Sequence, residues 1–87
     1  MQVLAQHYAH QGKYEQALAY GRQTLAKDPL LEEVHRQMLG FYGQLGDRSG
    51  VMRQYRQLET ILADELEIEP MPETQALYQN LIRRVAA

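Results

Sequence analysis

Few side chains in this sequence have the types and spacing that chemistry requires. His7 and His10 lie three residues apart, which would place them on one helix face, and Glu15 is a candidate for a third metal ligand. They do not complete a fixed tetrahedral ligand set, so we predict no metal site and expect the histidines to face solvent or line a groove. No nucleophile is paired with a base, and no glycine-rich loop follows a strand to hold a phosphate. We therefore predict neither an enzyme nor a cofactor.

The composition is that of an ordinary globular domain. Of its 87 residues, 45% are hydrophobic and 23% are charged, and there is no cysteine, which fits a reducing, cytoplasmic setting. No apolar run approaches the roughly 18 residues that span a bilayer, so we predict no membrane contact. The net charge of −2 argues against nucleic-acid binding by this segment, because phosphate binding needs clustered Lys and Arg. Arg48, Arg53 and Arg56 form only a modest basic stripe, which we expect to be a solvated helix face.

Glycine turns divide the sequence into helical hairpins. Gly12 and Gly46 lie 34 residues apart, and sliding the sequence by that distance also pairs Tyr8 with Tyr42. A fixed period of this length, with a glycine turn between two amphipathic runs, indicates a helical-repeat array. Asp28-Pro29 ends the first repeat, because the residue before a proline is pushed out of the α region.

The expected helices make an all-α domain. Apolar residues recur at spacings of three and four, which predicts helices over 1–11, 14–27, 31–44 and 48–66 and a capping helix over 72–86. We predict a tetratricopeptide-like right-handed stack of two antiparallel helical hairpins plus that C-terminal capping helix. A single domain covers 1–87, with a first repeat over 1–29 and a second over 30–66. The first helix begins without a capping signal, so we expect the chain to be a fragment of a longer protein.

Several spaced elements agree in order with one bacterial regulatory domain. They are Gly12–Leu18, Asp28–Arg36, Leu45–Arg48, Gln54–Arg56, Leu62–Pro70 and Pro72–Thr74. Together they resemble the bacterial transcriptional activator domain, which follows a winged-helix DNA-binding domain in SARP-type regulators. The resemblance implies a protein-interaction and regulatory module of a transcriptional regulator. It also implies that DNA is contacted only through a winged-helix domain that this sequence lacks.

The partner that the resemblance implies is a protein. It would be the regulator's other domains, a second copy of the chain or the transcription machinery. We expect a homodimer, because the first helix would expose a face that earlier helices cover. The alternative is a stand-alone tetratricopeptide-like adaptor, or the repeat segment of a signalling enzyme such as a cyclase or an ATPase.

Two glycines inside the third helix suggest a groove for the partner. Gly40 and Gly43 each cost about 1 kcal/mol relative to alanine in a helix interior. We hypothesise that they leave room for a partner's backbone on the concave face of the array. The residues expected to line this groove are Gln6, His10, Glu33, Arg36, Gln37, Gly40, Gly43 and Gln44. The alternative is that the glycines only permit close packing of one helix on another.

Two single residues carry local expectations. We expect His35 to pack or cap near the start of the third helix. Where the family commonly has serine before Pro72-Glu73, this sequence has Met71. Loss of a side-chain cap typically costs about 1 kcal/mol, so the last helix should start less firmly unless Met71 compensates by packing on the core.

Overall fold

Within residues 12–85, the part of the chain that the computed structural model describes, every regular element is a helix. The helices are α2 (Tyr14–Lys27), α3 (Glu32–Gln44), α4 (Arg48–Leu66) and α5 (Pro72–Arg84). The predicted all-α class is confirmed, and the bounds of these helices differ from the predicted ones by one or two residues at most. The helix predicted over 1–11 lies outside the described residues. None of the described helices is long and apolar enough to cross a membrane.

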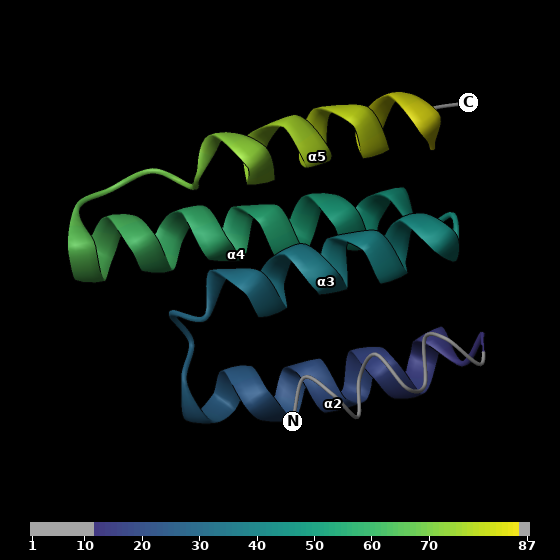
Figure 1. Cartoon of the computed structure of the whole chain (residues 1–87), viewed down its shortest axis with the longest axis horizontal. Coiled ribbons are helices and arrows are strands. Elements are labelled where there is room, and N and C mark those ends of the chain that lie inside the picture. The colour runs from purple at the N-terminus through teal and green to yellow at the C-terminus, as the bar shows by residue number, and fades with distance from the viewer. Residues whose placement is uncertain (1–11, 86–87) are drawn as a thin grey trace.

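Helix α3 lies at the centre of the arrangement (Figure 1). It contacts α2 on one side, pairs with α4, and also touches α5, which in turn contacts α4. Helices α3 and α4 run antiparallel and are joined by the short turn at Gly46 (Figure 1). The long connection between α4 and α5 lies at the opposite end of the hairpin and brings α5 back over both helices.

The turn between α3 and α4 satisfies the backbone groups at both helix ends. Gly46 has a φ of 68°, a left-handed conformation that glycine adopts without steric cost. The N–H of Gly46 donates to the carbonyl of Gly43 at 3.1 Å, and the N–H of Asp47 donates to the carbonyl of Tyr42 at 2.9 Å. This pair of bonds is a Schellman motif. Asp47 then caps α4, since its Oδ1 accepts from the N–H of Gly50 at 2.9 Å.

The core consists of two adjacent clusters that share α3. The first joins α2 to α3 and contains Ala17, Leu18, Leu25, Val34, Met38 and Phe41. The second joins α3, α4 and α5 through Leu39, Val51 and Leu81. Gly21 permits the close approach of α2 and α3, because a Cβ at that position would lie 2.7 Å from the sulfur of Met38.

The start of α5 is held by a residue from α3. Met71 provides no side-chain cap and is 45% exposed, so it does not compensate for the missing cap by packing on the core. Instead, Glu32 Oε2 accepts from the Met71 N–H and from the Thr74 hydroxyl, both at 2.7 Å. A carboxylate at a helix N-terminus is favourable because the first N–H groups have no partner within the helix. Glu32 therefore supplies the cap that the local sequence lacks.

Candidate protein-interaction surfaces

The structure places four of the predicted groove residues on one face of α3. Glu33, Gln37, Gly40 and Gln44 follow one another at spacings of four and three, so they form a single row. Glu33 and Gln44 are exposed, while Gln37 and Gly40 are half-buried. A Cβ added at Gly40 would meet no heavy atom within 4 Å, so the backbone is accessible there. We call these four residues the α3 row.

The other two described groove residues face α5 of the same chain. A Cβ at Gly43 would lie 2.6 Å from Cδ2 of Leu81, so the space beside this glycine is already filled. Arg36 Nη1 lies 3.3 Å from the Thr74 hydroxyl and 3.8 Å from a carboxylate oxygen of Glu73. Gly43 thus has the role that the alternative interpretation gave it, close packing of helix on helix. Gln6 and His10 lie outside the described residues.

His35 is buried near the start of α3, as expected from the sequence, and joins three segments. Its Nε2 lies 2.9 Å from the carbonyl oxygen of Pro29, and its Nδ1 lies 2.8 Å from Nε2 of Gln54. A carbonyl oxygen can only accept, so Nε2 carries the proton and Nδ1 accepts from the Gln54 amide. Burial lowers the pKa of His35, and the bond to Pro29 and the charge of Glu32 only partly oppose this effect. His35 is therefore a neutral structural residue.

Two tyrosines join α4 to α5. The rings of Tyr55 and Tyr78 are stacked with centroids 4.0 Å apart and planes 6° from parallel. Burial raises the pKa of Tyr55, and the charge of Glu59 raises it further. Both observations agree with a packing role for these two rings.

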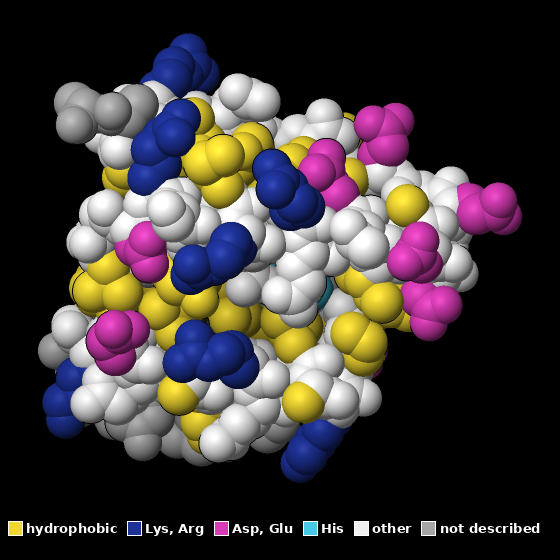
Figure 2. Space-filling model, turned by 180° about the vertical axis from the view of Figure 1, so that it is seen from behind, with side chains coloured by type: hydrophobic (Ala, Val, Ile, Leu, Met, Phe, Trp, Pro, Cys, Tyr) yellow, Lys and Arg dark blue, Asp and Glu magenta, His cyan; other side chains and the backbone are white. Residues whose placement is uncertain are grey.

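A groove between α2 and α4 was not among the predicted sites. It has a volume of about 360 Å³ and combines an apolar floor with arginines at its edges. Its lining residues are Arg22, Leu25 and Ala26 from α2, Met38 and Tyr42 from α3, and Arg53, Gln54 and Gln57 from α4. Figure 2 shows this face, on which hydrophobic side chains lie between Lys and Arg side chains. We call it the α2–α4 groove.

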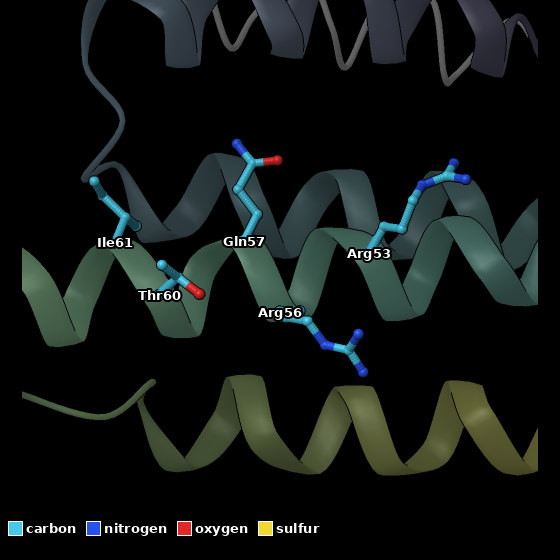
Figure 3. A pocket seen from close by; sticks show the side chains of 5 residues that line it. All are labelled: Arg53, Arg56, Gln57, Thr60 and Ile61. Atoms are coloured by element: carbon cyan, nitrogen blue, oxygen red, sulfur yellow. The ribbon is translucent and has the colours of Figure 1, made fainter.

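The groove adjoins a shallow depression on the outer surface of α4. This depression has a volume of about 390 Å³ and is lined by Arg53, Arg56, Gln57, Thr60 and Ile61. Arg53, Gln57 and Ile61 extend toward α2, whereas Arg56 extends toward α5 (Figure 3). Neither lining includes a carboxylate. Arg53 and Arg56 had been expected to form part of a solvated face; in the structure both line the depression, and Arg53 also lines the apolar groove.

The described side chains do not come together as a metal site. Between residues 12 and 85, no three His, Asp or Glu side chains are placed to hold a metal ion. Every buried side-chain nitrogen or oxygen in that range has a hydrogen-bond partner.

Comparison with known proteins gives a consistent match. The model of the family described as "Bacterial transcriptional activator domain" matches residues 1–82. The transcriptional regulatory protein MoaR1 of Mycobacterium bovis (strain BCG / Pasteur 1173P2) is 33% identical over 81 residues, which cover 82% of this chain and 26% of the relative. The MoaR1 protein of Mycobacterium tuberculosis (strain ATCC 25618 / H37Rv) matches with the same identity and coverage. The chain thus spans about a quarter of the length of these relatives. No solved structure matches it significantly.

Proposed function

The chain belongs to the bacterial transcriptional activator domain family, and from this premise we propose that it is the protein-interaction module of a cytoplasmic transcriptional regulator. The module acts through contacts with other proteins, while a separate domain of the regulator binds DNA. It carries out no chemical reaction and uses no cofactor. Its partners are the regulator's other domains, a second copy of the chain or the transcription machinery.

The family match over residues 1–82 is the observation that carries this proposal. The relatives named as transcriptional regulators are about four times as long as the matched part, so their sequence has room for a DNA-binding domain elsewhere. The surface of the described residues is consistent with protein contacts. It offers a polar row with accessible backbone on α3 and an apolar groove between α2 and α4.

The charge distribution supports the absence of direct DNA binding. The chain carries 9 Lys and Arg against 11 Asp and Glu, so it does not present the positive excess with which proteins hold the phosphate backbone. The exposed basic residues of α4 are Arg48, Arg53 and Arg56, and the exposed carboxylates of Glu59, Asp64 and Glu65 follow them on the same helix.

A tethering experiment tests the proposal. The 87-residue chain is fused to a DNA-binding domain of unrelated origin, and transcription is measured from a promoter that carries the matching operator. We expect the fusion to change transcription relative to the DNA-binding domain alone. A matched fusion carrying Leu39→Asp should lose the effect, because Leu39 is fully buried and a charge there should unfold the domain.

DNA retardation by the unfused chain supplies the second arm. We expect no retardation at moderate salt. An inactive but folded fusion, together with salt-sensitive DNA binding by the unfused chain, would contradict the proposal.

A further inference from the structure

Helix α4 carries opposite charges on the two halves of one exposed face. Arg53, Arg56 and Asp64 are all exposed, and Thr60 lies between the arginines and the aspartate. Their spacings of three and four place these four residues on the same side of the helix. This face points away from α3, which packs against the opposite side of α4 through Val51, Leu58 and Leu62. The face is basic toward the start of α4 and acidic toward its end.

The acidic end continues into an exposed stretch that also carries apolar side chains. Asp64, Glu65, Glu67 and Glu69 are exposed, and between them Leu66 and Ile68 are 50% and 49% exposed. We call residues 64–69 the acidic segment. Figure 2 shows Asp and Glu side chains gathered toward one end of the face, with hydrophobic and basic side chains across its middle. Exposed leucine and isoleucine flanked by carboxylates make a suitable ligand for an apolar groove with arginines at its edges.

The α2–α4 groove has that complementary chemistry. Leu25 and Met38 contribute apolar floor, and Arg22 and Arg53 lie at the edges. Within residues 12–85, neither Arg53 nor Arg56 has a carboxylate at ion-pair distance; the one such pair there is Arg36 with Glu73. The acidic segment cannot reach the groove of its own chain, because α4 is a continuous helix that holds the two apart by about 1.5 Å per residue.

We propose that two copies of this chain associate through antiparallel α4 helices, so that the acidic segment of each copy lies on the α2–α4 groove of the other. A two-fold axis at Thr60 matches the positions of the charges along α4. Arg56 and Asp64 lie four residues to either side of Thr60, and Arg53 and Glu67 lie seven residues to either side. Each arginine of one copy then faces a carboxylate of the other.

This symmetry also closes the assembly at two copies. Both contacts form at the same time and involve the same surface of each copy, as in an isologous dimer. The inference rests on the proposed role in protein contacts and names a second copy as one partner. It also assigns the expected homodimer to α4, a surface distinct from the first helix.

Charge reversal provides the test. Sedimentation is measured on the 87-residue chain over a wide range of concentration, at low and high salt. We expect concentration-dependent dimers that weaken as salt rises, because exposed ion pairs are screened. The variant Arg53→Glu/Arg56→Glu and the variant Asp64→Lys/Glu67→Lys should each associate at least about tenfold more weakly, since like charges then face each other.

Mixing the two variants makes the test specific. In the mixed dimer, the new Glu residues of one chain face the new Lys residues of the other, and the second contact keeps its natural charges. Association should therefore return in the mixture. Circular dichroism of each variant checks that these exposed substitutions leave the helices intact. A monomeric natural chain at all concentrations, or variants that associate as well as the natural chain, would overturn the inference.

The reporter experiment keeps this inference separate from the proposed function. A chain that is active as a monomer would refute the dimer and leave the proposed function standing. A dimer without reporter activity would contradict the proposed function and leave the dimer standing. If Arg53→Glu/Arg56→Glu abolishes the activity of a chain shown to be monomeric, the groove serves another acidic protein and the self-association is wrong.

Discussion

Replacing each of the two glycines of α3 by alanine should change stability in opposite directions. At Gly40 the added methyl group meets no heavy atom within 4 Å, so only the helix propensity changes. Glycine is about 1 kcal/mol less favourable than alanine in a helix interior. Gly40→Ala should therefore raise the free energy of unfolding by about 0.5–1 kcal/mol.

At Gly43 the same methyl group enters the core. It would lie 2.6 Å from Cδ2 of Leu81, which is too close for two carbon atoms. Leu81 is only 5% exposed and packs with Leu39 and Val51, so its side chain has little room to move away. Overpacking of this kind costs about 1–3 kcal/mol. Gly43 lies in the last turn of α3, outside the helix interior to which the propensity gain of alanine applies. We therefore expect the overpacking to dominate, so that Gly43→Ala lowers the free energy of unfolding by about 1 kcal/mol or more.

Thermal and urea unfolding, followed by circular dichroism, would separate the two cases. For a domain of this size, 1 kcal/mol moves Tm by about 4–8 °C, so the variants should melt on opposite sides of the natural chain. Ala76→Gly, at an exposed position of α5, calibrates the propensity scale and should lower stability by about 1 kcal/mol. If Gly43→Ala is as stable as Gly40→Ala, the contact with Leu81 does not limit the space beside Gly43 and our reasoning fails.

Gly40→Ala also tests the predicted groove on α3. If a partner's backbone lies on the α3 row, the added methyl group should reduce reporter activity while it stabilises the fold. A stabilised domain with unchanged reporter activity would show that the partner does not use Gly40.

Three further substitutions test other parts of the structure. Glu32→Ala should lower the free energy of unfolding by about 1–3 kcal/mol in urea, because two donors at the start of α5 lose their acceptor. The control Glu33→Ala should change it by less than about 0.5 kcal/mol, and equal effects would contradict the capping role of Glu32. Asp47→Ala should remove the cap of α4 and about 1 kcal/mol of stability, most of which Asp47→Asn should retain. The lowered pKa of His35 means that the unfolded chain binds a proton more readily than the folded one. Stability should therefore fall as pH drops below about 6.5, by at most about 1.4 kcal/mol per pH unit, and His35→Leu should lack this fall.

The helix bounds could be predicted because their signals are local. Pro29 stops one helix, Gly46 provides the left-handed turn, and Pro72 starts α5 in its first turn. Each of these residues restricts its own backbone or that of its neighbour, so the constraint is readable from a few adjacent letters.

The division of the groove residues could not be predicted in the same way. Arg36 and Gln37 are adjacent in sequence, yet the first bonds to α5 and the second lies on the α3 row. Which of the two turns outward depends on the angle at which α5 crosses α3. That angle depends on side-chain contacts such as Gly43 with Leu81, which join residues far apart in the chain.

The hydrogen-bond partners of buried polar side chains could not be predicted from the sequence either. The tautomer of His35 depends on Gln54, which is 19 residues away, and on the carbonyl of Pro29. The α2–α4 groove has a similar origin, because Arg22 lies on α2, Arg53 lies on α4, and α3 packs between these two helices. Such sites become visible once the packing of the helices is known.

The bond from Glu32 to the start of α5 has a consequence for how the domain opens. The Met71 N–H and the Thr74 hydroxyl depend on an acceptor that belongs to the first turn of α3. The first turn of α5 should therefore exchange its amide hydrogens together with that turn of α3, as one cooperative unit. The terminal helix is then not a transferable part. Grafted onto another helical domain, it would need a carboxylate at the position equivalent to residue 32.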